Sequence, residues 1–188
     1  MKYLFFMAMT LLLFSGCAYK NEALALDSYK AEYTGPLSKD KKTIYLRTVK
    51  DLRANKSIVG YIDQKSATTI KFFTQENFAE KYTEGLNYAL NLAGFNLDAS
   101  TQEASLVVEV YIKDVEIIYS DKNFDTNLKG EIEIEVIVRK GDEVITQNFR
   151  QKGSKWMAPS NSSKDLEPFF YTLFADSIDQ IVTRLTRF

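Results

Sequence analysis

The side chains that most often carry out chemistry in proteins are scarce in this sequence. The 188 residues contain no histidine and a single cysteine, Cys17. Imidazole acid–base catalysis, histidine-ligated metal sites and intrachain disulfides are therefore excluded. Carboxylates remain, but no spacing brings together the candidates for a glycosidase-like pair, Asp121, Asp125, Glu131 and Asp142. We therefore expect a protein that is not an enzyme and holds neither a metal nor a cofactor.

Cys17 ends a run of residues that is typical of a secretory signal peptide. Lys2 precedes an apolar stretch, residues 3–14, which is followed by the small residues Ser15 and Gly16. The stretch is shorter than the roughly 20 residues that a membrane-spanning helix needs. The pattern resembles a bacterial lipoprotein signal, which implies cleavage after residue 16 and acylation of Cys17 by fatty acids such as palmitate. The alternatives are an ordinary signal peptide with an incidental cysteine, or an N-terminal anchor helix.

Three segments follow from this interpretation. Residues 1–16 are expected to be a lipoprotein signal peptide, residues 17–42 a lipidated cysteine with a polar tether, and residues 43–188 a single periplasmic domain. By resemblance to bacterial sorting rules, Ala18 after the cysteine favours the outer membrane over the inner one. The formal net charge of −1 gives no argument for nucleic acid as a partner. The expected partners are the lipid bilayer, through acylated Cys17, and an envelope protein.

The elements of the domain are predicted from hydrophobic periodicity. Alternation predicts strands at residues 44–49 and 58–62. Helical spacing predicts a helix that is capped by Thr74, runs to Ala93 and is ended by Gly94. Two further alternating segments, 106–119 and 128–138, precede a third that begins at residue 143. The apolar parity changes across Lys113–Asp114, which predicts a β-bulge or a strand switch. A regular apolar stripe from Leu166 to Leu185 then predicts a final helix that begins near Ser163 or Asp165.

Gly141–Asp142 is predicted to form a two-residue hairpin turn of type II′. This turn pairs Lys140 with Glu143 and every earlier residue with its counterpart on the returning strand. One face of the hairpin then carries apolar pairs, Val138–Ile145 and Ile134–Phe149. The other face carries pairs of opposite charge, Glu133–Arg150 and Glu131–Lys152. The fold class expected is α+β, in the order β-(β)-α-β-β-β-α. Its antiparallel sheet has four to five strands, with both helices packed on one face.

This order of elements behind a lipoprotein signal is similar to the YajG family of uncharacterised bacterial lipoproteins. The resemblance covers residues 43–185 and is carried by the helix end Ala89-Leu90-Asn91-Leu92-Ala93-Gly94-Phe95, the strands 106–119 and 132–138, the segment Asn148-Phe149-Arg150, and the helix from Asp176-Ser177-Ile178 onward. These are core and cap residues. The resemblance implies a periplasmic α+β domain and supplies no activity or functional residues.

The function expected is that of a non-enzymatic lipoprotein that binds another component of the cell envelope. The candidate contact residues are the aromatic side chains Tyr45, Tyr61, Tyr111 and Trp156. The alternative is an auxiliary lipoprotein subunit of an envelope lipid-transport or ABC-transport system. That alternative predicts an apolar groove between the last helix and the sheet, lined by Phe169, Phe170, Tyr171 and Phe174, unless these side chains simply fill the core.

Overall fold

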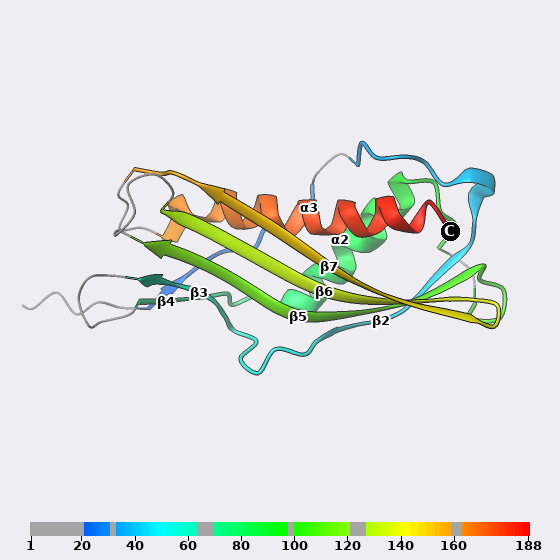
Figure 1. Ribbon diagram of the computed structural model, residues 1–188, viewed down its shortest axis with the longest axis horizontal. Coiled ribbons are helices and arrows are strands. Elements are labelled where there is room, and N and C mark those ends of the chain that lie inside the picture. Colours follow the sequence, from blue (N-terminus) through cyan, green and yellow to red (C-terminus); the bar gives the residue numbers. More distant parts are fainter. Residues whose placement is uncertain (1–20, 31–32, 64–69, 98–99, 121–126, 159–162) are drawn as a thin grey trace, which may run out of the picture.

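The longest strands of the sheet and the longer helix run along the long axis of the molecule (Figure 1). The computed structural model describes residues 21–30, 33–63, 70–97, 100–120, 127–158 and 163–188. The strands are β1 (Glu22–Ala23), β2 (Ile44–Asp51), β3 (Ile58–Asp63), β4 (Ile70–Phe73), β5 (Leu106–Ser120), β6 (Leu128–Lys140) and β7 (Glu143–Lys155). The helices are α2 (Phe78–Leu92) and α3 (Glu167–Leu185), with short 3₁₀ turns η2 (Lys39–Lys41) and η3 (Ser163–Asp165).

Within the described residues the sheet has seven strands and is mixed, so the expectation of a four- to five-stranded antiparallel sheet is wrong. Its order is β1-β4-β3-β5-β6-β7, with β2 also paired to β5. Both β2 and β3 run parallel to β5: β2 pairs with residues 106–112 and β3 with residues 117–120. Parallel pairing arises because α2 carries the chain back to the end where β2 begins, where Ile44 N donates to Asn96 O at 2.9 Å.

The antiparallel part of the sheet follows the sequence closely. The predicted pairs of β6 with β7, from Lys140↔Glu143 to Glu131↔Lys152, are all confirmed. Gly141 has a φ of +58°, as the first central residue of a type II′ turn requires. The predicted irregularity at Lys113 is confirmed as a register shift between Ile112 and Asp114, so residues 106–120 form one continuous bulged strand.

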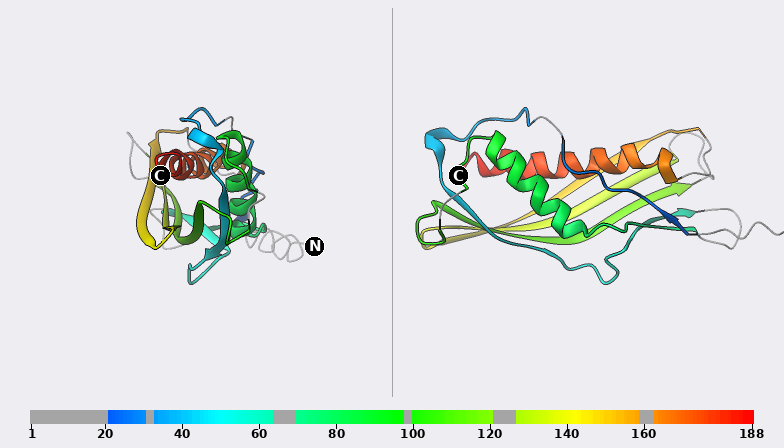
Figure 2. Two further views of the ribbon diagram at one scale, coloured as in Figure 1. Left: turned by 90° about the vertical axis from the view of Figure 1, so that its right-hand side faces the viewer. Right: turned by 180° about the vertical axis from the view of Figure 1, so that it is seen from behind.

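The two helices lie on the same side of the long strands (Figure 2). Helix α2 begins at Phe78, and its cap is Asn77 rather than the expected Thr74, because the Asn77 side chain accepts a hydrogen bond from Glu80 N. Thr74 directly follows β4, and its hydroxyl donates to Glu76. The predicted helix end at Gly94 is confirmed by a φ of +84°.

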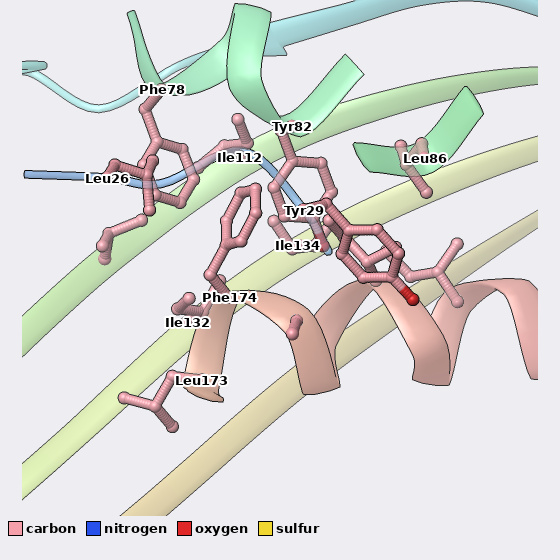
Figure 3. Close-up of a cluster of buried hydrophobic side chains, with 14 of the residues drawn as sticks. Leu26, Tyr29, Phe78, Tyr82, Leu86, Ile112, Ile132, Ile134, Leu173 and Phe174 are labelled. Carbon is pink, nitrogen blue, oxygen red and sulfur yellow. The ribbon is translucent and has the colours of Figure 1, made fainter. Parts of the chain in front are cut away.

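Aromatic side chains from both helices form the centre of the core (Figure 3). Phe78 stacks on Tyr82 with ring centroids 5.9 Å apart, and Phe174 meets both rings edge-on at 5.7 and 5.6 Å. Inward side chains of the long strands, Ile112 and Ile134 among them, complete this core. The sheet and the helices thus bury one continuous apolar interior.

Residues 21–30, here called the N-terminal strap, differ from the tether expected for residues 17–42. Strand β1 pairs with β4, and Leu24, Leu26 and Tyr29 are buried in the core. The strap lies along the seam between the helices: the Tyr29 ring meets the Tyr88 ring of α2 edge-on, and Lys30 N donates to the Tyr171 hydroxyl of α3 at 2.8 Å. Apolar side chains at alternate positions make this short segment part of the fold.

Candidate interaction surface

The face of the sheet that points away from the helices, here called the outer face, carries most of the charged side chains of the long strands. On β6 the residues alternate between buried apolar side chains, such as Ile132 and Ile134, and half-buried charged ones, such as Glu131, Glu133 and Glu135. The alternation follows from the two-residue period of a strand. The outer face is therefore the broad polar surface from which a binding site can be built.

One carboxylate on this face is almost completely buried between two arginines. Glu109 of β5 is 8% exposed. Arg47 of β2 donates to it at 2.7 Å, the Tyr111 hydroxyl donates to it at 3.0 Å, and Arg139 Nε lies 3.7 Å away. Burial acts to raise the pKa of Glu109, but the hydrogen bonds from Arg47 and Tyr111 and the charge of Arg139 outweigh it and leave this pKa below its ordinary value.

Sheet pairing brings these side chains together from three strands. Val107 on β5 pairs with Tyr45 of β2 on one side and with Arg139 of β6 on the other. A register shift between Leu46 and Thr48 makes Arg47 an extra residue of β2, and such bulges re-aim side chains. We call the five residues Tyr45, Arg47, Glu109, Tyr111 and Arg139 the Arg47–Arg139 patch.

The patch has a surplus of positive charge at its surface. The Arg47 and Arg139 side chains are 42% and 41% exposed, whereas that of Glu109 is 10% exposed. The Nε of Arg139 is buried and has no hydrogen-bond partner among the described residues. Because one carboxylate serves two guanidinium groups, the patch can accept an acidic group from outside.

A second charge network on the outer face is already balanced. Arg150 binds two carboxylates, with Nε 2.6 Å from Glu131 and Nη2 2.9 Å from Glu133. Lys152 Nζ lies 3.0 Å from Glu131. Beside this network is an open depression of about 410 Å³, lined in part by Glu116, Lys129 and Glu131. Burial, with Asp114 and Glu131 nearby, raises the pKa of Glu116. Because Glu131 has two basic partners, this depression lacks the two unpaired carboxyls that glycoside hydrolysis needs.

The four predicted contact residues do not form one cluster. Tyr45 and Tyr111 lie within the Arg47–Arg139 patch, and both are half-buried. Tyr61 of β3 pairs with Ile118, seven residues along β5 from Tyr111, which corresponds to roughly 23 Å. Trp156 follows β7 and is 56% exposed, so its side chain lies at the surface and not in the core.

Sequence reasoning missed the two arginines of the patch. A usable signal was present, because the hairpin register places Arg139 on the same face as Glu131, Glu133 and Glu135. No signal in the sequence pairs β2 with β5, so Arg47 could not have been joined to Glu109.

The groove expected from the lipid-transport alternative is filled by the chain itself. Phe170 and Phe174 are fully buried and Phe169 is 7% exposed. Phe170 packs with its ring centroid 6.1 Å from that of Phe78. Tyr171 lines a small depression of about 290 Å³, together with Asp27, Lys164 and Glu167 among others. The phenylalanines of α3 are therefore core residues.

Cys17 and Ala18 lie outside the described residues. Within the described ranges, no group of three or more Cys, Asp or Glu side chains is arranged to hold a metal ion. Among those same ranges, no helix combines the length and the hydropathy that crossing a bilayer requires.

Two solved structures share this fold at low sequence identity. The protein XCC0632 from Xanthomonas campestris, assigned to the family DUF330, superposes with a TM-score of 0.50 at 11% identity, over 90% of this chain and 93% of that chain. The structure of an uncharacterised protein gives a TM-score of 0.50 at 8% identity, over 89% of this chain and 97% of that chain. At these identities the likeness concerns the fold alone.

Sequence comparison identifies the family. No curated protein matches this chain. The sequence profile of Lipoprotein_16, described as uncharacterised lipoprotein, matches residues 32–184. This range includes α2, all of α3 but its last residue, and every described strand except β1. This is the YajG family that the order of elements resembles. The chain therefore belongs to the Lipoprotein_16 family of uncharacterised lipoproteins.

Proposed function

We propose that this protein is a non-enzymatic lipoprotein, anchored through acylated Cys17 on the periplasmic side of the outer membrane, that binds an acidic envelope component through the Arg47–Arg139 patch. Membership of a lipoprotein family supports the lipid anchor. The cysteine behind Ser15 and Gly16 supports its position, and Ala18 supports the outer membrane.

The observation that carries the binding proposal is the excess of arginine around Glu109. A network that only stabilised the fold would need one guanidinium to neutralise this carboxylate. Two are present, and each side chain is about two-fifths exposed, at 42% and 41%. Planar guanidinium groups bind carboxylates and phosphates through paired hydrogen bonds, and the neighbouring Tyr45 and Tyr111 add the aromatic area that is common at binding surfaces.

A non-enzymatic role is supported by the state of the outer-face carboxyls. Glu116 has a raised pKa, but its cross-strand neighbour Glu131 is paired with Arg150 and Lys152. A general acid and a second, unpaired carboxyl in one depression would support a hydrolase instead.

Site-specific photo-crosslinking in intact cells tests the binding proposal. A photoreactive amino acid would replace Tyr45 or Tyr111 in the patch, with Tyr88 as the matched control. Tyr88 is a tyrosine of the helix side that is 52% exposed. We expect the same adduct from positions 45 and 111, none from position 88, and loss of the adduct in the Arg47→Glu, Arg139→Glu variant.

Equal adducts from all three positions, or none from the patch, would contradict the assigned surface. Failure of radiolabelled palmitate to enter the wild-type protein would contradict the anchor. The thermal unfolding of the arginine variant must be measured beside the wild type, so that loss of the adduct is not loss of the fold.

The lipid-transport alternative predicts a different outcome. Detergent-free purification would recover bound phospholipid, and the lipid would have to displace Phe170 and Phe174 from the core. Because these rings are packed against Phe78 and Tyr82, the binding of an acidic envelope component has the better structural support.

A further inference from the structure

The chain enters the fold at one end of the sheet. Strand β1 is parallel to β4, and the Asn21 side chain accepts a hydrogen bond from Lys71 N at 3.2 Å. Strand β4 begins next to the last residues of β3, and Asp63 of β3 pairs with Ser120, the last residue of β5. Asn21 therefore lies at the end of the sheet where β3 and β5 stop. We call this the anchor end.

Little chain separates the anchor end from the lipid attachment site. Cys17 precedes Asn21 by four residues, which span at most about 14 Å when fully extended. The N-terminal strap cannot lengthen this connection without leaving the fold, because Leu24 and Leu26 are buried and Leu24 N donates to Phe73 O at 2.8 Å. An acylated Cys17 thus holds the anchor end close to the bilayer.

An exposed tryptophan stands on the far side of the same end. Lys155, the last residue of β7, pairs with Leu128, which pairs with Tyr119 near the end of β5. Trp156 follows Lys155 and is 56% exposed. β1 and β7 are the outermost strands of the sheet order and five strand spacings apart, which is up to roughly 24 Å. Asn21 and Trp156 therefore lie on opposite edges of one end of the sheet.

We propose that the anchor end rests on the phospholipid surface, with the Trp156 indole in the headgroup region as a second contact beside acylated Cys17. This proposal rests on the lipid anchor of the proposed function. Tryptophan suits such a position because its ring is apolar while its N–H can meet water or headgroups. Two contacts on opposite edges hold the long strands upright on the membrane.

The upright orientation determines how far the binding surface stands from the bilayer. The Arg47–Arg139 patch flanks Val107, and Ser120 lies 13 residues further along β5, which corresponds to about 40 Å. The hairpin turn at Gly141 lies at the same remote end as the patch. Phe188 lies there too, since its carbonyl accepts a hydrogen bond from Lys140 at 2.8 Å. The patch is therefore presented to partners deep in the periplasm.

The fluorescence of Trp156 tests the orientation directly, because the chain contains one tryptophan. Full-length lipidated protein would be reconstituted into vesicles of phosphatidylethanolamine and phosphatidylglycerol, with or without lipids brominated near the headgroup end of the acyl chain. We expect the brominated lipid to reduce the emission to roughly half, because an indole in the headgroup region lies close to bromine at that end of the acyl chain.

A matched variant places the only tryptophan at the other end of β7. In Val144→Trp, Trp156→Phe the indole occupies a position where valine is 52% exposed. Its emission is expected to be unquenched. Inserting Gly–Ser repeats between Tyr19 and Lys20 in the wild-type background keeps the anchor but frees the end, and is expected to abolish most of the quenching of Trp156.

The possible failures are distinguishable. Wild-type protein that does not float with the vesicles would overturn the lipid anchor, and the orientation with it. Protein that floats while Trp156 stays unquenched, or is quenched no more than the tryptophan at position 144, would overturn the orientation alone.

Discussion

The hydroxyl of Tyr29 donates a hydrogen bond to the carboxylate of Asp179 across a sequence separation of 150 residues. It joins the N-terminal strap to the middle of α3, on the line where the strap covers the seam between the helices. Burial raises the pKa of Asp179, the Tyr29 hydrogen bond lowers it in part, and nearby Asp176 raises it further. The strap is therefore held by a polar contact as well as by its apolar side chains.

Tyr29→Phe should lower the free energy of unfolding by about 1–2 kcal/mol, because it leaves a partly buried carboxylate without its donor. Urea denaturation followed by far-UV circular dichroism measures the difference. Tyr88→Phe is the matched control, since the Tyr88 side chain is largely exposed and meets Tyr29 through its ring. Equal effects of the two substitutions would show that the hydroxyl of Tyr29 contributes nothing.

Acid should weaken the protein in part through Glu109. The pKa of Glu109 is lowered in the folded state. The stability that Glu109 contributes is therefore fully present above its unfolded-state pKa of about 4.3, and is lost as the pH falls through its folded-state pKa. Glu109→Gln should therefore be less stable than the wild type near neutral pH, and the difference should shrink in acid. Free energies of unfolding between about pH 7 and pH 3 measure it.

Asp179 should affect the pH dependence of the free energy of unfolding in the opposite direction. Its pKa is raised in the folded state, so its contribution is greatest below the unfolded value and is lost as the pH rises through the folded value. The disadvantage of Asp179→Asn should therefore grow as the pH falls. If the loss of stability relative to the wild type changed with pH in the same direction for the Glu109 and Asp179 variants, the environments described for these carboxyls would be wrong.

The close approach of α3 to the sheet depends on glycine at position 130. A methyl group there would run into the Leu173 side chain, and at the paired Gly153 it would lie 3.0 Å from the same residue. Gly130→Ala should therefore lower the free energy of unfolding by about 1–3 kcal/mol through overpacking. In the Leu173→Ala background the same substitution should have a smaller effect, and the part that remains is due to Phe169, whose ring would lie 2.9 Å from the added methyl group. A double-mutant cycle measures this coupling.

The effects of replacing the two arginines of the patch on the free energy of unfolding should not be additive. Either Arg47→Ala or Arg139→Ala leaves one guanidinium near Glu109, whereas the double variant leaves a buried carboxylate without a charged partner. We expect the double variant to lose about 1–2 kcal/mol more than the sum of the single variants. Restoring additivity by adding Glu109→Gln would confirm that Glu109 carries the coupling. Simple additivity in the presence of Glu109 would argue against the network.

The parts of the structure that were predicted correctly depend on residues close in sequence. The register of β6 with β7 follows from a two-residue turn at Gly141 and from the alternation of apolar and charged side chains. The bulge at Lys113 is likewise visible as a change of parity within one strand.

The parts that were missed depend on partners far away in the chain. Strands β1 and β4 have two and four residues, too few for a periodic signal, and they exist because each finds an edge to pair with. The patch required β2 to pair with β5, which brought Arg47 to Glu109 over 62 residues of sequence.

The sequence by itself determined both helices, the strands longer than four residues, the hairpin register and the family, since these depend on alternation, turn chemistry and residue order. The tertiary structure alone decided that β2 and β3 run parallel to β5, and that Leu24, Leu26 and Tyr29 belong to the core. The physical reason is that strand direction is set by where the α2 crossover returns the chain. The strap packs as it does because the seam between α2 and α3 exists only once both helices are in place.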